Sequence, residues 1–342
     1  MVDSKQQWKA WLYLLPALIL LAVFTVYPII NTVRISILEG YKPLAAIGGE
    51  RYPLGIGNFT KVISYKGFTT CLTNTLLLCV LTVPISCFLA LLVSVCLNSI
   101  NRLGKVLQTI YFLPYVTNTI AIGMVFAMMF NIVGLKQVNV AEYLSTGGQY
   151  TIYNIYTDVN GEKWGFVAQS WGIINNLLQL FGINPVNWIN SGGNINGGSS
   201  TYVANIAVMV VYIVWNALPF KILILLSGLQ GVDKQYYQAA KIDSTPRWKV
   251  LFRITIPCLM PQILYLMVTS FIGAFKEYTS IVGLFGSQGT TNGSYNMYTI
   301  VYYIYDNMNG TTTSYAAAAA VFLFVIILLF TFLQLGLSKK RY

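Results

Sequence analysis

The sequence contains no histidine, and this absence excludes several kinds of site. Imidazole-based metal sites, histidine general bases and Ser-His-Asp triads all need that side chain. Charged residues are also scarce, at 9% of 342 residues, against roughly 25% in ordinary soluble domains. No glycine-rich loop ending in Lys-Ser or Lys-Thr occurs, so the usual phosphate-binding loop of an ATPase is missing. We therefore expect no cofactor in this chain, and any ATP to be bound by partner subunits.

Cysteine is also rare and irregularly spaced. Four of the five cysteines fall in or at the edge of one apolar run, where a free cysteine behaves as a small hydrophobic residue. No pair has the Cys-x-x-Cys spacing, so the sequence predicts neither a metal site nor a disulfide framework. The cysteines are Cys71, Cys79, Cys87, Cys96 and Cys258.

Long apolar runs, by contrast, are abundant, and hydrophobic residues make up 56% of the chain. Runs of this length fit the thickness of a bilayer, and they predict an all-α integral membrane protein with six transmembrane helices. The first run could be a cleaved signal peptide, but no small-residue cleavage site follows it, so we interpret it as an uncleaved helix. The predicted spans are about 11–31, 72–97, 106–130, 203–226, 262–284 and 315–337.

The formal net charge of +11 does not require a nucleic acid partner, because basic residues also mark the cytoplasmic side of a membrane protein. Six spans place both termini on one side. The two termini and the links 98–105 and 227–261, which would lie on that same side, together hold 12 basic and three acidic residues. The opposite segments are more than twice as long and hold seven basic and six acidic residues. We therefore predict that both termini lie in the cytoplasm of a bacterial cell and the chain in its plasma membrane. The first outer loop, with five basic residues, is the exception.

Residues 134–200 differ from the rest of the chain, because they are rich in Gly, Asn, Ser and Tyr. Residues of β-type flank Asn160-Gly161, and this pattern predicts a β-hairpin over 146–167. Residues 192–200 have the composition of a flexible linker. We interpret 134–200 as an extracytoplasmic insertion and expect the hairpin to serve docking or stability outside the permeation path.

Residues 236–261 are the longest polar and basic stretch between apolar spans. The helical pattern breaks near Ser244–Pro246, because proline disfavours helix in the residue before it and lacks a backbone donor. A second amphipathic run follows from Arg247 to Ile256. Two short helices at an angle, with Ala239 and Ala240 at the tip, would form a compact knob suited to a partner's groove.

This stretch resembles the EAA loop of ABC-importer permeases. Ala239, Ala240 and Asp243 match that motif, followed by Ile254, Pro257 and Pro261, while two positions depart from it. Gln238 stands where the family has Glu, and Ser244 stands where it has Gly, which puts the sharpness of the bend in question. The resemblance implies a cytoplasmic coupling loop that contacts an ATPase subunit. The coupling residues are Gln238, Ala239, Ala240, Asp243 and Ser244; the alternative is an ordinary basic loop.

Adjacent charges inside the fifth span indicate a functional site. Lys276 and Glu277 would each cost ~2.5–3.5 kcal/mol at the bilayer centre, so such residues normally face a cavity or a partner. On a continuous helix, Ser270, Ala274 and Glu277 share one face, with Lys276 about 100° away. In the fourth span, Asn216 and Phe220 share a face around Pro219, at a depth in the membrane close to that of Ser270 and Glu277. Two polar faces at one depth predict a central site. The alternative is that the two charges lie near the outer interface or pair with a partner subunit.

Trp215-Asn-Ala-Leu-Pro-Phe220 resembles the fourth-span segment that lines the sugar site of maltose-type permeases, and similar segments cover nearly the whole chain apart from the hairpin. The resemblance implies a type I ABC importer permease fold and a non-enzymatic subunit that imports a carbohydrate, most simply an oligosaccharide. The implied partners are a homologous permease, two ATPase subunits and an extracytoplasmic solute-binding protein. The implied substrate path is Asn216, Ala217, Phe220, Ser270, Ala274 and Glu277.

Three other functions are weighed against this one. A permease for another polar solute, such as a polyamine, would have the same coupling loop. A self-powered secondary carrier would not need that loop. A membrane-embedded enzyme would need clustered catalytic groups, which the lack of histidine and the scarcity of carboxylates disfavour.

Overall fold

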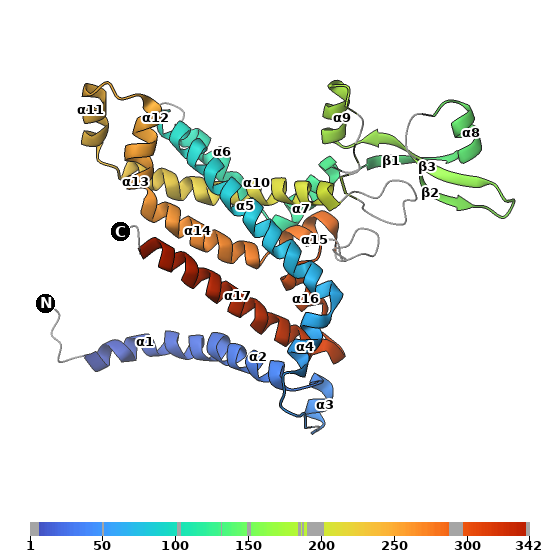
Figure 1. The fold of residues 1–342 in the computed structure, drawn as a ribbon, viewed down its shortest axis with the longest axis horizontal. Helices are drawn as coiled ribbons and strands as arrows, with labels where there is room; N and C mark the ends of the chain where they lie inside the picture. Colours follow the sequence, from blue (N-terminus) through green and yellow to red (C-terminus); the bar gives the residue numbers. More distant parts are fainter. Residues whose placement is uncertain are drawn as a thin grey trace. The chain divides into compact units, whose positions relative to one another are not determined.

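The computed structural model describes residues 7–49, 51–100, 104–130, 132–148, 152–183, 186, 188–189, 202–286 and 297–339. Most of them are helical, and a small sheet accompanies the helices (Figure 1). This confirms the predicted fold class. The chain forms two compact units. Met1–Thr69 and Ile300–Phe330 make up the first unit, and Thr70–Thr299 and Thr331–Tyr342 make up the second.

The first unit begins with a long apolar helix. Helix α1 (Gln7–Leu21) continues through a π-helical turn (Ala22–Val26) into α2 (Tyr27–Ile37). The π turn directly precedes Pro28, whose missing N–H interrupts the regular hydrogen-bond ladder. The candidate membrane span runs over Trp11–Ile37, with a mean hydropathy of 2.3 and no part of its apolar window buried within the chain. It includes the predicted span 11–31 and extends it by more than a turn.

A short loop folds back onto the end of α2. It carries α3 (Pro43–Ile47) and leads into α4 (Gly57–Ser64). Asn58 is fully buried, and its side-chain amide donates to the carbonyl oxygens of Ser36, at 3.0 Å, and Leu38, at 2.8 Å. The loop is therefore fixed to the carbonyls that a helix end normally leaves without partners.

The rest of the first unit comes from the C-terminal part of the chain. It contains α16 (Ile300–Asp306), the 3₁₀ turn Gly310–Thr312 and most of α17 (Thr313–Lys339), which covers the predicted sixth span. Aromatic rings form its core. The ring of Phe68 lies 5.4 Å from that of Tyr303 and 5.5 Å from that of Phe322, both edge-on. Edge-on pairs are a favoured geometry for buried aromatic rings.

Two long helices form the frame of the second unit. Helix α5 (Lys66–Asn98) and helix α10 (Tyr202–Gln230) contain Pro84 and Pro219 within their lengths. Ala90, Leu97, Ile222, Leu225, Leu226 and Leu266 make a buried apolar cluster that joins α5, α10 and α14 (Met260–Phe275). Because all six lie toward the proposed cytoplasmic ends of their helices, this cluster closes that side of the unit.

The predicted third span, 106–130, is not one straight helix. Helix α6 (Gly104–Val116) and helix α7 (Thr119–Phe130) meet at an angle of 98°. The hydroxyl of Thr117 donates to the carbonyl of Pro114 at 2.7 Å, and the side chain of Asn118 accepts the Ile120 amide at 2.9 Å. Asn118 therefore caps a new helix, because its oxygen satisfies a donor that a helix start leaves free.

The predicted fifth span, 262–284, is also broken. Helix α14 ends at Phe275, and a separate helix α15 (Thr279–Phe285) follows three residues later. The prediction that Glu277 continues the helical face of Ser270 and Ala274 is wrong, because Glu277 lies between the two helices. Its carboxylate accepts the Ser280 amide at 3.1 Å and so supports the start of α15.

Helices α7 and α15 pack closely through two glycines. A Cβ atom built on Gly123 would lie 2.7 Å from the Cα of Gly283, and one built on Gly283 would lie 3.0 Å from the Cα of Gly123. Such distances are shorter than carbon contacts allow, so only glycine lets the two backbones approach this far.

The predicted hairpin is part of a three-stranded antiparallel sheet. Strand β3 (Lys163–Trp171) pairs with β2 (Ile152–Thr157) and with β1 (Ile132–Asn139), in the order β1-β3-β2. The turn between β2 and β3 contains Gly161, at a φ of +82°, a value that glycine adopts without strain. The sequence analysis missed β1, which directly follows the end of α7. Residues 149–151 of the predicted hairpin and the linker 192–200 lie outside the described residues.

Two short helices flank this sheet in the chain. Asn139 caps α8 (Val140–Ser145) by accepting two of its amides. Helix α9 (Ile173–Leu180) follows β3. Its buried Asn175 accepts the indole N–H of Trp188 at 3.0 Å and donates to the carbonyl of Val186 at 2.9 Å. These bonds hold the chain after α9 in place.

Candidate functional site

A cavity of about 310 Å³ lies in the second unit, between α5, α6, α10 and the end of α14. It contains all six residues that the sequence predicts for the substrate path, although they come from different helices. The lining residues are Thr82, Val83, Ser86, Tyr115, Ile213, Asn216, Ala217, Phe220, Lys221, Thr269, Ser270, Gly273, Ala274 and Glu277. The fold thus brings the predicted residues together in one place.

Two polar side chains in the cavity have no partner of their own. Asn216 on α10 and Ser270 on α14 are both half-buried, and neither side chain is hydrogen-bonded to another residue of the part of the chain that is described. A half-buried amide or hydroxyl without a partner is costly unless a ligand or water completes it. These two groups are therefore ready to bind a polar ligand.

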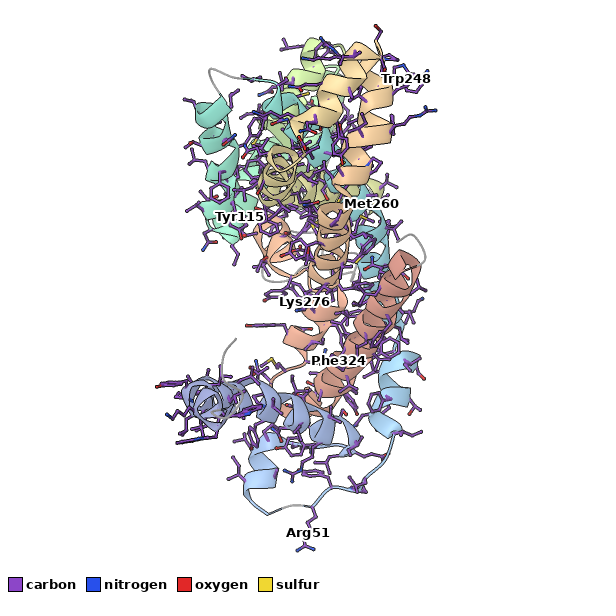
Figure 2. The ribbon with its side chains drawn as sticks, turned by 90° about the vertical axis from the view of Figure 1, so that its left-hand side faces the viewer. Arg51, Tyr115, Trp248, Met260, Lys276 and Phe324 are labelled. Carbon is purple, nitrogen blue, oxygen red and sulfur yellow. The ribbon has the colours of Figure 1, made fainter. Side chains whose placement is uncertain are left out.

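An aromatic pair forms another wall. The rings of Tyr115 and Phe220 lie 5.8 Å apart with an interplanar angle of 17°, a stacked arrangement. Tyr115 is at the end of α6, next to the bend, and its position is labelled in Figure 2. Because its ring is 52% exposed, it presents an aromatic surface to the cavity. The sequence analysis gave Tyr115 no role.

Glu277 brings a carboxylate to the cavity from the break between α14 and α15. Its backbone carbonyl accepts the hydroxyl of Thr299 at 2.7 Å, and one carboxylate oxygen accepts the Ser280 amide. These bonds fix the residue at the wall of the cavity, where a carboxylate can accept hydrogen bonds from a ligand. Lys276, the residue before it, is exposed and does not line the cavity.

Lys221 is a functional candidate that the sequence analysis missed. Its side chain is only 5% exposed, lines the cavity, and donates from Nζ to the hydroxyl of Ser86 on α5 at 2.5 Å. A signal was available, since a lysine within the fourth span is as costly there as Lys276 and Glu277 in the fifth. The ammonium group joins α5 to α10 at one end of the cavity.

The proposed coupling segment forms two short helical pieces. Helix α11 (Lys234–Ile242) is followed by α12 (Arg247–Val250), the π-helical turn Leu251–Thr255 and α13 (Ile256–Cys258). The hydroxyls of Tyr237 and Thr255 lie 3.3 Å apart and link the pieces. Trp248, labelled in Figure 2, is 62% exposed on this segment.

The bend in this segment falls where the sequence predicts it. Ser244 has a φ of +50°, the left-handed conformation that a glycine would adopt more easily at this position. The serine therefore keeps the bend despite its departure from the family motif. Gln238, Ala239 and Asp243 are exposed, but Ala240 is 6% exposed. The prediction that Ala240 lies at the tip is wrong, because this residue is buried within the segment itself.

The cavity suits a ligand that carries many hydroxyl groups. Amide, hydroxyl and carboxylate groups can exchange hydrogen bonds with such hydroxyls, while the Tyr115–Phe220 pair covers an apolar face. Among the described residues, no group of three His, Cys, Asp or Glu side chains could hold a metal ion.

Comparison with known proteins agrees with this architecture. The chain is 26% identical over 339 residues to the lactose transport system permease protein LacF of Rhizobium radiobacter. The aligned region covers 97% of this chain and 95% of that protein. It is 27% identical over 296 residues to the arabinooligosaccharides transport system permease protein AraP of Bacillus subtilis (strain 168). That aligned region covers 86% of this chain and 77% of AraP.

The fold also matches a solved structure. In the crystal structure of a bacterial alginate ABC transporter in complex with alginate pentasaccharide-bound periplasmic protein, one chain superimposes with a TM-score of 0.73 and 20% identity. The match covers 99% of this chain and 96% of that one. Residues 82–341 match the family described as binding-protein-dependent transport system inner membrane component. The chain therefore belongs to this family of membrane components of binding-protein-dependent transport systems.

Proposed function

We propose that this protein is one transmembrane subunit of an ABC importer that moves a carbohydrate, most simply an oligosaccharide, into the cell. The cavity carries this proposal, because it combines a stacked aromatic pair with two polar side chains that have no partner. The names of the relatives support the same substrate class. As a membrane component of a transport system, the chain is not an enzyme.

The charges in the cavity favour a sugar over a polyamine. A polyamine carries several positive charges and would need several carboxylates, but Glu277 is the single carboxylate among the described lining residues. Lys221 lines the same cavity and would repel a polycation. A neutral sugar has no net charge to balance, so a lining with one cation and one anion is compatible with it.

The coupling segment supports an importer driven by ATP. In this proposal the ATP is bound by two partner ATPase subunits, and their closure moves α11–α13 and then α14, which begins one residue after α13. A homologous permease completes the pathway, and both termini lie in the cytoplasm. An extracytoplasmic solute-binding protein delivers the sugar on the opposite side, where we propose that the sheet of strands β1 to β3 docks it.

The test is a pair of conservative variants of neighbouring residues. Glu277→Gln keeps an oxygen for the Ser280 amide but removes the charge that accepts sugar hydroxyls, while Lys276→Gln changes an exposed residue outside the cavity. Loss of a charged hydrogen bond costs ~1.5–3 kcal/mol, or roughly 10- to 150-fold in binding. We expect Glu277→Gln to reduce sugar uptake by this factor in vesicles with the complete transporter, and Lys276→Gln to leave it unchanged.

Two outcomes would overturn parts of the proposal. Equal and small effects of both variants would remove Glu277 from the substrate path. Uptake by the purified chain without any copurified ATPase subunit would identify a self-powered carrier. Basal ATPase activity and subunit assembly, measured in the same preparations, must stay at the wild-type level for both variants if the effect concerns the sugar alone.

A further inference from the structure

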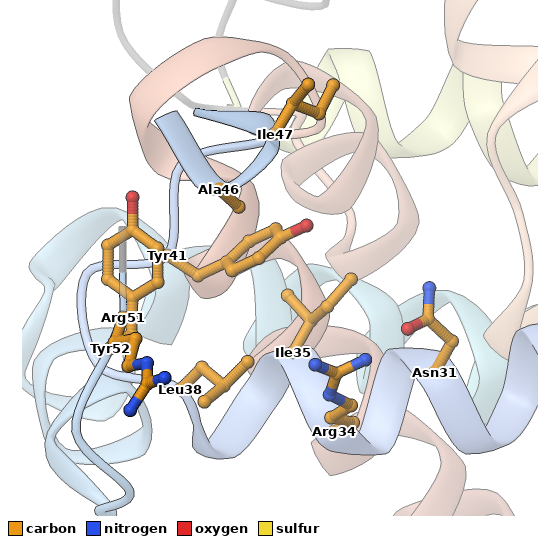
Figure 3. Close-up of a pocket in the computed structure, with 9 residues that line it drawn as sticks. All are labelled: Asn31, Arg34, Ile35, Leu38, Tyr41, Ala46, Ile47, Arg51 and Tyr52. Carbon is orange, nitrogen blue, oxygen red and sulfur yellow. The ribbon is translucent and has the colours of Figure 1, made fainter. Parts of the chain in front are cut away.

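A second cavity, of about 480 Å³, lies in the first unit beside the outer end of the first span (Figure 3). Its floor is one face of α2, where Asn31, Arg34 and Ile35 follow at helical spacing. Helix α3 covers it from the other side with Ile47, and the ring of Tyr41 projects between the two helices (Figure 3). This cavity is separate from the substrate cavity, which lies in the second unit.

Arg34 and Arg51 are the two basic residues among the described lining of this cavity. Neither has an ion pair or a hydrogen bond with another described residue. The nearby carboxylate of Glu39 accepts the amide of Gly57 at 2.8 Å. Figure 2 shows Arg51 extending away from the ribbon at the tip of the loop. The cavity therefore presents two positive charges without a negative partner from this part of the chain.

Helix capping does not explain Arg34, although a basic residue in a last turn can bind the free carbonyls of a helix. At the end of α2 those carbonyls already have partners. Asn58 donates to Ser36 and Leu38, and the Gly55 amide donates to the carbonyl of Ile37 at 2.9 Å. Arg34 is thus available for a ligand, and the same bonds hold the walls of the cavity in place before any ligand arrives.

Apolar side chains surround the charged cavity. Leu44, Ile47, Leu54 and Ile56 are between 70% and 85% exposed on the loop that forms it. Tyr41 and Tyr52 lie 5.5 Å apart, edge-on, at its side. Exposed aliphatic groups, tyrosines and arginines together are typical of the headgroup region of a bilayer, where each can reach its preferred surroundings. Five basic residues in this outer segment also exceed what the positive-inside rule predicts.

We propose that this cavity binds the phosphate of an anionic phospholipid from the outer leaflet. Arginine forms bidentate hydrogen bonds with phosphate oxygens, and two of them here can neutralise the headgroup. The exposed aliphatic residues contact the acyl chains beside it. The bound lipid then anchors the outer end of the first span, whose apolar window has no residue buried within the described chain. The leaflet assignment rests on the proposed topology, while the phosphate site rests on the geometry of the first unit alone.

The experiment compares lipids retained by the complete transporter purified from nanodiscs of phosphatidylcholine with and without phosphatidylglycerol. Mass spectrometry of the extracted lipids measures the bound phosphatidylglycerol. Arg34→Gln/Arg51→Gln removes both charges, and Lys42→Gln removes an exposed charge of the same loop that does not line the cavity. We expect the double variant to retain at least about tenfold less phosphatidylglycerol than the wild type, and Lys42→Gln to retain the same amount. The single variant Arg51→Gln, in an exposed loop position, replaces the double one if the latter does not assemble.

Three results would overturn the proposal. The first is equal phosphatidylglycerol retention in the wild type and the arginine variants. The second is retention of labelled inorganic phosphate in phosphatidylcholine nanodiscs, lost in the variants, without any preference for phosphatidylglycerol. The third is weaker docking of the solute-binding protein to the arginine variants with unchanged lipid retention, which would identify an acidic protein surface as the occupant. Sugar uptake by the Glu277→Gln variant is measured separately and does not depend on lipid retention. If the lipid site is refuted, the proposed transport function is therefore not affected.

Discussion

The contact between Gly123 and Gly283 allows a prediction that connects packing to function. A Cβ atom at position 123 would lie 2.7 Å from the Cα and 3.0 Å from the carbonyl carbon of Gly283. Because carbon atoms prefer separations of roughly 3.5–4.0 Å, Gly123→Ala requires α7 and α15 to separate by about 1 Å. Both close atoms belong to the backbone, so no side-chain rotation can relieve the overlap.

Overpacking of this kind costs about 1–3 kcal/mol. For a unit of this size we expect Gly123→Ala to lower the midpoint of thermal unfolding of the purified complex by roughly 2–10 °C. The same shift displaces α15, whose Ser280 amide holds Glu277 in the substrate cavity. Sugar uptake should therefore fall even at temperatures where the complex is fully folded.

Gly336→Ala is the matched control. Gly336 is also a helical glycine, in α17, but a Cβ atom there meets nothing within 4 Å. This variant should be as stable as the wild type, or slightly more stable, since alanine favours helix over glycine. If Gly123→Ala unfolds at the same temperature as Gly336→Ala, the close approach of the two helices is refuted. If it unfolds earlier but transports normally, α15 does not position Glu277.

Two further predictions concern Lys221 and the coupling segment. Lys221→Met keeps an unbranched side chain, one heavy atom shorter, but removes the ammonium group bound to Ser86. We expect sugar-stimulated ATPase activity to fall about tenfold with assembly intact, and Ser86→Ala to act in the same direction. Normal activity of both variants would contradict a role for this contact. Ala239→Glu places bulk and charge on an exposed position of α11 and should reduce copurification of the ATPase subunit, measured by gel densitometry, whereas Lys234→Gln at the start of the same helix should not. Unchanged transport and ATPase association in Ala239→Glu would show that this face does not contact the ATPase.

The sequence by itself determined the class of protein, most of the helices and the family. Long apolar runs predict membrane helices without reference to any neighbour, because the bilayer requires each one to satisfy its own backbone hydrogen bonds. The bend at Ser244 and the turn at Gly161 were also readable, since proline, asparagine and glycine restrict the local backbone. Glu277 stood out because charged residues inside apolar spans are rare. The other path residues, three of them apolar, were predicted from the resemblance of the fourth-span segment and from the spacing along the fifth span.

Only the tertiary structure decided where helices end and which side chains meet. Apolar residues resume after the Lys276–Ser280 stretch, so the region 262–284 was interpreted as one helix. The apolar pattern did not show that α14 stops at Phe275 or that Glu277 supports the start of a second helix. Strand β1 was missed because its partner, β3, lies more than twenty residues away in the sequence. Lys221 meets Ser86 across 135 residues. Helical periodicity shows which residues share a face of one helix. Which faces of different helices meet depends on tertiary packing, and this packing forms the cavity.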